Sequence, residues 1–230
     1  MAGVGTEVPA AWRYERRRAD VVRLLASLPV LAITAWLAHG TLPSWEITVF
    51  TRLNKGTDAL YWPIWTVMQL GTLIAIPITA AVALAFRHAR LAANLAISGT
   101  TAYLFALVVK HLVDRSRPAD LLAGVNLHGH VAATGLGFPS GHAAVATALA
   151  VAVFPYLHHR AGRVAVWSAA LVVSGARIYV GAHFPLDVIG GAVLGTAVGS
   201  AVHLMIGAPS ELGGNGFITR WRPDRSRATG

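Results

Sequence analysis

The sequence contains no cysteine and few charged residues. Of its 230 residues, 13% are Asp, Glu, Lys or Arg, whereas 55% are hydrophobic. The absence of cysteine excludes disulfide bonds, thiolate metal sites and catalysis by a cysteine nucleophile. Soluble domains carry roughly 25% charged residues, so this sequence has too few for a surface that faces water. Acidic residues are especially scarce, and the carboxylate clusters that bind hard metal ions are not expected.

Long apolar runs predict an all-α, polytopic membrane protein with about six transmembrane helices in one bundle. Each run has roughly the 17–25 residues that a bilayer core requires. We expect a basic N-terminal segment (1–20), a transmembrane domain (21–206) and a basic, disordered tail (207–230). The first run could be a signal peptide, but further spans follow it, which favours an uncleaved helix. The candidate spans are residues 21–39, 61–86, 91–113, 142–157, 164–180 and 185–206.

Basic residues are distributed unevenly around these spans. Outside the motifs described below, most arginines precede the first span, join spans two to three and four to five, or lie in the tail. All these places fall on one side of a six-span arrangement, and cytoplasmic flanks carry an excess of Lys and Arg. We therefore expect a cell-membrane protein with both termini in the cytoplasm. The positive charge indicates contact with anionic membrane lipids, and no nucleic-acid-binding motif is present.

Three glycines, Gly191, Gly195 and Gly199, repeat at four-residue spacing in the last span. Small residues at this spacing allow membrane helices to approach closely. We expect them to pack within the monomer, and dimerisation is the alternative. The sequence does not determine the oligomeric state.

Three basic residues, Lys110, Arg117 and Arg177, lie at or just beyond the outer ends of spans three and five. Charges seldom gather at one depth of a membrane without a function. Arg presents a planar fork of donors that matches phosphate oxygens, and Lys presents a point charge. Together they could neutralise the oxygens that carry charge during phosphoryl transfer. Alternatively, Lys110 and Arg117 anchor the protein at the lipid headgroups.

The segment Pro139-Ser140-Gly141-His142 opens the fourth span. Ser140 is a favourable N-cap, and Pro139 keeps the preceding chain extended. The free backbone N–H groups at this helix start would face an anion, and Gly141 allows a phosphate to come close to the backbone. We expect Ser140 and Gly141 to bind the phosphate.

His183 and Asp187 stand four residues apart at the start of the last span, on one helix face. Asp187 can hold one imidazole nitrogen of His183 and leave the other as a nucleophile toward phosphorus. His142 would then act as general acid and base. Because cations and amides neutralise the charge, no metal or other cofactor is expected. Alternatively, Asp187 only neutralises Arg177 in a structural ion pair.

At these residues the chain resembles the type 2 phosphatidic acid phosphatase superfamily. The family's three signatures correspond to KHLVDRSRP from Lys110, PSGH from Pro139 and ARIYVGAHFPLD from Ala176, in the same order. The resemblance implies a six-helix membrane phosphatase with a histidine nucleophile. The serine of the third signature is replaced by Ala176, which removes a side-chain hydrogen bond to phosphate but leaves the nucleophile in place.

The resemblance implies hydrolysis of a lipid phosphate through a phosphohistidine intermediate, and the distribution of basic residues predicts that the site lies on the extracytoplasmic side. The substrates it implies are polyprenyl diphosphate, phosphatidylglycerol phosphate or phosphatidate, of which we favour the first. The alternatives are a phosphotransferase with an alcohol as acceptor, vanadate-dependent peroxidase chemistry, and a non-catalytic protein that binds or transports lipid. The first two share the anion pocket with a phosphatase.

Two further clusters in the long loop 114–141 are interpreted as ordinary loop groups. Asp114 and Arg115 are assigned supporting positions without a catalytic role. His128 and His130 could suggest a metal site, but two ligands without a third form a weak one. A loop of this length in a compact protein is usually functional, and it could touch the substrate.

Overall fold

The computed structural model describes residues 14–129 and 131–209, and most of this chain is helical. The short β1 and β2 pair with each other in antiparallel register. In chain order the elements are β1 (Tyr14–Glu15), α1 (Arg18–His39), α2 (Ser44–Asn54), η1 (Asp58–Leu60), α3 (Tyr61–Met68), η2 (Gln69–Gly71), α4 (Ala75–Ala85), α5 (Ala89–Val113), α6 (Pro118–Leu121), α7 (Gly141–Val153), η3 (Phe154–Tyr156), α8 (Arg160–Tyr179), α9 (Pro185–Ile206) and β2 (Ala208–Pro209).

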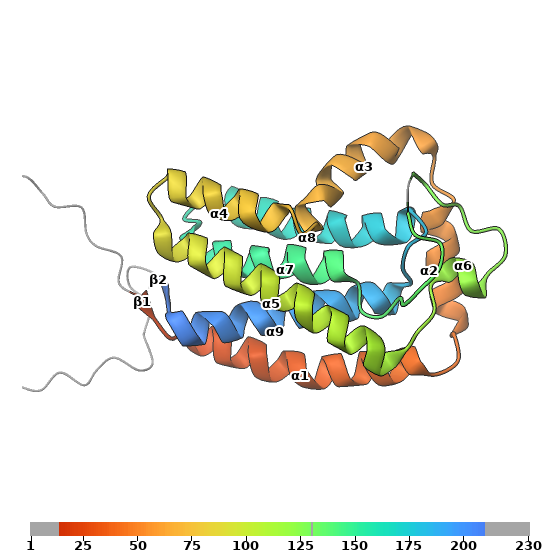
Figure 1. Ribbon diagram of the computed structural model, residues 1–230, viewed down its shortest axis with the longest axis horizontal. Coiled ribbons are helices and arrows are strands. Elements are labelled where there is room, and N and C mark those ends of the chain that lie inside the picture. Colours follow the sequence, from red (N-terminus) through yellow and green to blue (C-terminus); the bar gives the residue numbers. More distant parts are fainter. Residues whose placement is uncertain (1–13, 130, 210–230) are drawn as a thin grey trace, which may run out of the picture.

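The long helices α1, α4, α5, α7, α8 and α9 run along one axis and form a bundle (Figure 1). Helix α7 occupies its middle, where it packs against α5, α8 and α9. Its residues from Ala143 to Ala152 are all buried and mostly small and apolar, which is the composition of a helix surrounded by others. Helix α1 lies against α9, and α4 against α5.

The outside of the bundle is apolar. Trp36, Leu112 and Met205 are each 75% exposed, and many other large hydrophobic side chains also point outward. Among the residues that the structure describes, four helices (α1, α5, α8 and α9) are long and apolar enough to cross a membrane. This confirms the predicted class, an all-α polytopic membrane protein, because such a surface is stable in lipid and not in water.

The span expected as one helix over 61–86 is instead broken. Two apolar segments, Asp58–Gly71 and Ala75–Ala85, meet at an angle of 72°. The backbone becomes extended at Thr72, and a Cβ atom at Gly71 would lie 2.7 Å from the carbonyl oxygen of His142. The absence of a side chain at Gly71 therefore allows the broken span to pack closely against α7. The expected span 142–157 corresponds to α7 and η3, a shorter apolar unit.

Glycines of α9 explain the close packing of α7 and α9. Cβ atoms added at Gly191 and Gly195 would overlap the carbonyl oxygens of Ser140 and Ala144, which belong to α7 and its N-cap. Gly199 faces Val151 in the same way. The prediction that these glycines pack inside the monomer is confirmed, since all three face a helix of the same chain.

The connections formed by residues 40–60 and 114–141 contain short helices. Helix α2 and η1 lie within 40–60, and the one-turn α6 lies within 114–141. At the opposite end of the bundle, β1 ties the start of α1 to the end of α9 through β2. The predictions for the N-terminal segment and the tail otherwise concern 1–13 and 210–230, which lie outside the described residues.

Candidate active site

The predicted site residues come together at the end of the bundle opposite β1 and β2. There the end of α5, the loop that follows it, the start of α7, the end of α8 and the start of α9 meet (Figure 1). The charges of Arg177, Lys110 and Arg117 all act on the ring of His183. Residues from three distant signatures therefore surround one imidazole.

A tight turn between α8 and α9 positions His183. The backbone N–H groups of Ala182 and His183 donate to the carbonyl oxygen of Arg177, at 3.1 and 3.2 Å. Gly181 adopts a φ of +81°, which a side chain would strain. The turn thus places His183 next to Arg177, and Pro185 begins α9 directly after it.

Asp187 lies beside the His183 ring, as its four-residue spacing predicts. Its Oδ2 atom is 3.5 Å from Nδ1 of His183, and both side chains are buried. Oδ2 also accepts a hydrogen bond from the backbone N–H of Phe184 at 2.9 Å, so Asp187 caps the first turn of α9. Among the described residues, Nδ1 of His183 has no hydrogen-bond partner within bonding geometry.

Burial and neighbouring cations lower the pKa of His183. Removal from water disfavours the charged imidazole, and the positive charges of Arg177, Lys110 and Arg117 act in the same direction, so the pKa falls well below its usual value. His183 is therefore neutral at pH 7. A neutral imidazole keeps a free lone pair on one nitrogen, which a nucleophile requires.

Ser140 is the N-cap of α7, as the sequence predicts. The Oγ atom of Ser140 accepts a hydrogen bond from the Ala143 N–H at 3.5 Å, and its backbone N–H donates to the carbonyl oxygen of Asp187 at 2.8 Å. These contacts fix the N-cap against α9. A Cβ atom at Gly141 would meet nothing within 4 Å, so the space on that side of the residue is open.

The three predicted cations contact neutral groups, namely backbone carbonyl oxygens and a sulfur atom. Lys110 donates from Nζ to the carbonyl oxygens of Leu136 and Gly137, at 2.9 and 3.1 Å. Arg117 donates to the Ala132 carbonyl oxygen at 2.9 Å, and Nη1 of Arg177 lies 3.3 Å from the sulfur of Met68.

No acidic side chain of the described residues pairs directly with these three cations. Within the described part of the chain, no salt bridge involves Lys110, Arg117 or Arg177. The Nε atoms of both arginines are buried and have no hydrogen-bond partner there. Buried donors without partners are unfavourable, and a ligand with acceptor atoms would satisfy them.

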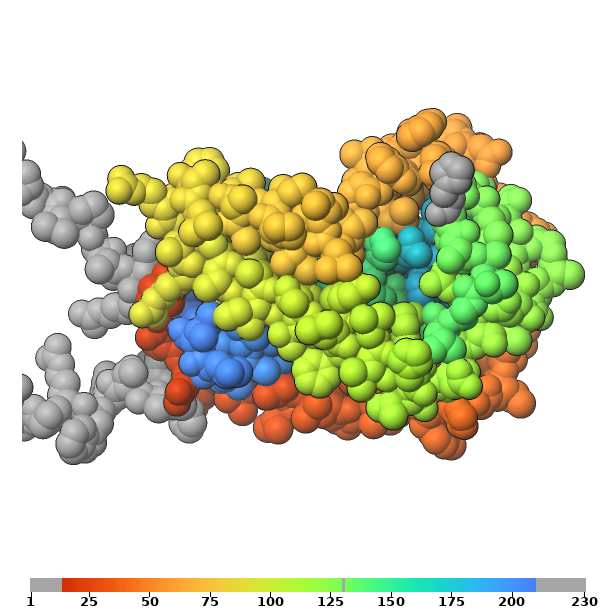
Figure 2. All heavy atoms as spheres, in the orientation of Figure 1, coloured from red at the N-terminus to blue at the C-terminus, as the bar shows by residue number. Residues whose placement is uncertain are grey.

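A cavity of about 280 Å³ opens beside these groups. Figure 2 shows a hollow between α3 and the loop that precedes α7, and atoms of the α7 start and the α8 end lie at its base. The side chains of Arg117, His142 and Arg177 line this cavity. The rest of the wall is formed by Tyr61, Trp65, Met68, Gln69, Thr72, His128, Val131 and Ala132.

His128 also lies at this cavity. Its Nδ1 is 2.9 Å from Oδ1 of Asp58, and its ring stacks on Tyr179 with centroids 4.4 Å apart. His130 lies outside the described residues. In the described part of the chain, no group of three or more His, Asp or Glu side chains is placed to hold a metal ion.

Ala176, which stands where the signature has serine, is buried in an apolar cluster. It packs with Met68, Tyr179, Val180 and Ala182. The methyl group contributes to this packing and offers no donor to an anion.

Sequence reasoning missed one buried ionic group at the site. Arg115, for which the sequence predicts a loop or supporting position, donates to Oδ1 of Asp187 at 2.9 Å and to Oε2 of Glu46 at 2.6 Å. Glu46 was not identified at all. A signal was nevertheless present, because Glu46 is the only charged residue in the apolar stretch 24–51, and lone carboxylates in such stretches are usually functional.

Comparisons with known proteins agree with this architecture. Residues 87–210 match the PAP2 superfamily. YbjG of Escherichia coli (strain K12), a putative undecaprenyl-diphosphatase, is 26% identical over 165 residues, which cover 67% of this chain and 79% of that protein. The undecaprenyl-diphosphatase of Sulfolobus acidocaldarius is 32% identical over 121 residues, which cover 53% of this chain and 58% of that protein.

Two crystal structures have a similar fold. LpxE of Aquifex aeolicus aligns with a TM-score of 0.62 and 25% identity, and the match covers 68% of this chain and 93% of LpxE. A transmembrane PAP2-type phosphatidylglycerolphosphate phosphatase of Bacillus subtilis aligns with a TM-score of 0.65 and 22% identity over 78% of this chain and 94% of that one. Because the family match covers more than half of the chain and includes all the site residues predicted above, this protein belongs to the PAP2 superfamily.

Proposed function

We propose that this protein is an integral-membrane lipid phosphatase that works without a metal ion and through a phosphohistidine intermediate. The observation that carries the proposal is the arrangement of Lys110, Arg117 and Arg177, whose charges act on the ring of His183 and which form no salt bridge within the described part of the chain. A phosphate group supplies the oxygens and the negative charge that this arrangement lacks.

In the first step His183 attacks phosphorus. Since Nδ1 faces Asp187, the attacking atom is Nε2. A bond forms between Nε2 and phosphorus while the bond from phosphorus to the leaving oxygen breaks. His142, which lines the cavity with Arg117 and Arg177, donates a proton to that oxygen. The cations and the amide of Gly141 stabilise the charge on the remaining phosphate oxygens.

In the second step water hydrolyses the phosphohistidine. His142, now unprotonated, accepts a proton from the water molecule as its oxygen attacks phosphorus. The bond between Nε2 and phosphorus breaks, inorganic phosphate leaves, and both histidines return to their starting states. No step requires a redox partner or a cofactor.

The names of the relatives favour a polyprenyl diphosphate as substrate. The two similar sequences described above are named as undecaprenyl-diphosphatases, one of them putatively. The apolar outer surface next to the site is suited to a substrate that stays in the bilayer. Phosphatidylglycerol phosphate and phosphatidate remain the other candidates.

The distribution of arginines supports a site on the extracytoplasmic side, with both termini in the cytoplasm. Because the sequence contains no cysteine, an introduced cysteine is the only thiol of the protein, and its labelling tests the orientation in the membrane. Ala123→Cys in the loop near the site and Arg160→Cys at the opposite end both alter exposed positions. In intact cells a membrane-impermeant maleimide should label only the first. Labelling of only the second would reverse the orientation.

The decisive experiment is phosphate release from a panel of these three lipids by protein purified in detergent, with and without excess EDTA. We expect activity with at least one lipid, no loss with EDTA, and release at the background level for His183→Ala. His111→Ala, which removes an exposed histidine from α5, is the matched control and should retain activity. Full activity of His183→Ala would end the proposal. Transfer to an added alcohol without release of phosphate would identify a phosphotransferase.

A further inference from the structure

Three buried charged residues form a connected group behind the proposed nucleophile. Glu46 of α2 and Asp187 of α9 have no exposed surface, and Arg115, from the loop after α5, is 6% exposed. The side chain of Arg115 bridges the two carboxylates. It donates from Nη2 to Oε2 of Glu46 at 2.6 Å and from Nη1 to Oδ1 of Asp187 at 2.9 Å.

Glu46 also holds the start of α9 directly. Its Oε1 atom accepts hydrogen bonds from the Leu186 backbone N–H at 2.8 Å and from Nη1 of Arg115 at 3.1 Å. The first turn of α9 carries Asp187, and the preceding turn carries His183. One carboxylate on α2 therefore fixes both the backbone next to Asp187 and the guanidinium that binds it.

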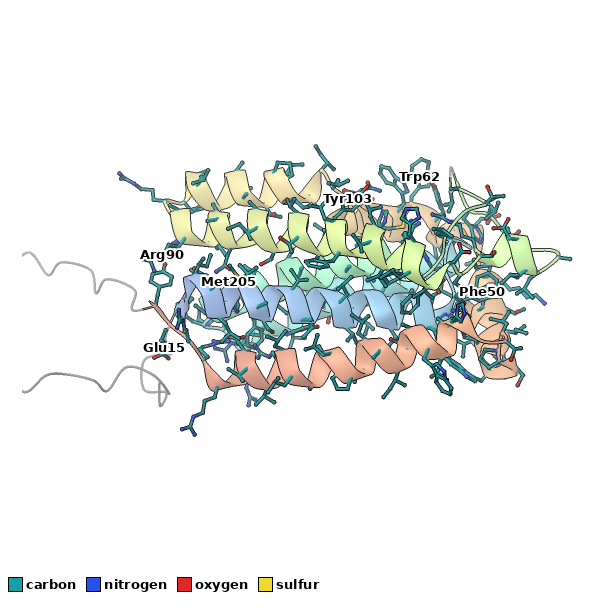
Figure 3. All side chains as sticks on the ribbon, turned by 60° about the horizontal axis from the view of Figure 1, so that its bottom comes forward. Glu15, Phe50, Trp62, Arg90, Tyr103 and Met205 are labelled. Carbon is teal, nitrogen blue, oxygen red and sulfur yellow. The ribbon has the colours of Figure 1, made fainter. Side chains whose placement is uncertain are left out.

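The aromatic rings around the group restrict its movement. The Arg115 guanidinium lies over the ring of Phe184 at 5.0 Å, and this ring packs against Phe50 of α2 with centroids 5.2 Å apart. Figure 3 labels Phe50 at this end of the bundle. With Oδ2 of Asp187 bonded to the Phe184 N–H and Oδ1 bonded to Arg115, both oxygens of the carboxylate have fixed partners.

The charges explain why a second carboxylate is needed. If Arg115 and Asp187 were alone, the guanidinium would cancel the charge of the carboxylate. When both carboxylates are ionised, the two carboxylates and one guanidinium of this group carry one net negative charge next to His183. This matters during attack, because the ring becomes positive when Nε2 bonds to phosphorus, and a nearby negative charge stabilises it. Burial lowers the pKa of Arg115, but its hydrogen bonds and the charges of Glu46 and Asp187 outweigh this and raise it, so Arg115 stays charged.

We infer that Glu46 is a positioning residue of the active site, which acts through Arg115 and the Leu186 backbone to hold Asp187 in place beside His183. This inference rests on the proposed phosphatase function. Neither Glu46 nor Arg115 reaches the cavity that contains Arg117, His142 and Arg177. Loss of Glu46 should therefore slow the chemical step and leave phosphate binding unchanged.

The test compares Glu46→Gln and Arg115→Lys with the wild-type protein on the lipid that gives the highest phosphate release. We measure kcat, KM and the inhibition constant of inorganic phosphate. For both variants we expect kcat to fall about 10- to 100-fold, as for other residues that orient a functional group, while the inhibition constant stays within about twofold. Glu46→Asp, which keeps the charge, should recover part of kcat. Glu15→Gln, at the other end of the bundle (Figure 3), is the control for this kind of substitution.

Two results would overturn the inference. One is wild-type kcat in folded Glu46→Gln, and the other is a parallel rise of the phosphate inhibition constant, which indicates a general collapse of the site. The melting temperature in detergent identifies a folded variant. If neither Glu46→Gln nor Arg115→Lys folds, the test uses Glu46→Asp. Its shorter side chain should lower kcat and leave the phosphate inhibition constant unchanged, and wild-type kcat in this variant would overturn the inference. A wild-type protein inactive on every lipid would contradict the proposed function instead.

Discussion

His183 and Asp187 lie 3.5 Å apart through Nδ1 and Oδ2, close enough to interact but not hydrogen-bonded. Oδ2 is already bonded to the Phe184 backbone at 2.9 Å. Asp187 therefore serves the backbone of α9 and the ring of His183 at the same time.

Replacement of Asp187 by asparagine should mainly affect turnover. Asn retains an oxygen for the Phe184 N–H but has no negative charge for the His183 ring, so we expect kcat to fall about 100-fold or more. KM should change much less, because Asp187 does not face the cavity. Steady-state kinetics measure both values. Asp114→Asn, at an exposed position with a φ of +52° that Asn tolerates, is the control, and an equal loss there would contradict the assignment.

The lowered pKa of His183 determines the acid side of the pH profile. His183 must be neutral to attack, so activity should disappear as the pH falls through its pKa. Since burial and the charges of Arg177, Lys110 and Arg117 lower this pKa below 6.5, the acid limb of kcat/KM should lie below pH 6.5. The profile is measured in constant ionic strength, because salt screens the cations. A limb centred above pH 6.5 would count against His183 as the nucleophile.

Arg177 should be sensitive even to a conservative change. A lysine keeps the charge but offers no planar fork to phosphate oxygens. For Arg177→Lys we expect the inhibition constant of inorganic phosphate to rise about tenfold, the loss of roughly one charged hydrogen bond. Arg52→Lys, an exposed substitution on α2, should leave it unchanged. Wild-type phosphate inhibition in Arg177→Lys would show that Arg177 does not bind phosphate.

The contact between α7 and α9 should tolerate no added side chain at Gly195. A Cβ atom there would overlap the Ala144 carbonyl oxygen, whereas at Gly175 of α8 it would meet nothing within 4 Å. Gly195→Ala should lower the melting temperature in detergent, at a cost of about 1–3 kcal/mol for overpacking. Gly175→Ala should leave it unchanged or raise it, because alanine favours helix. Equal melting temperatures of the two variants would contradict this packing.

The sequence by itself determined the class of the protein. Runs of about 20 apolar residues with few charges can satisfy their backbone groups in lipid only as helices, and the structure has helices at each predicted run. It also indicated which polar residues lie together, since Lys110, His142, Arg177 and His183 each stand at or near the same end of their spans. Helices that cross one bilayer must bring such ends to one depth, whatever their packing.

Only the tertiary structure decided the break after Gly71 and the bridge from Glu46 through Arg115 to Asp187. The break is stabilised by contact with His142, which lies far away in the sequence. The members of the bridge are separated by 69 and 72 residues and come from α2, a loop and α9. Local periodicity indicates which face of a helix is apolar, but it does not indicate which helix covers that face. A lone glutamate in an apolar stretch therefore has a partner that packing alone selects.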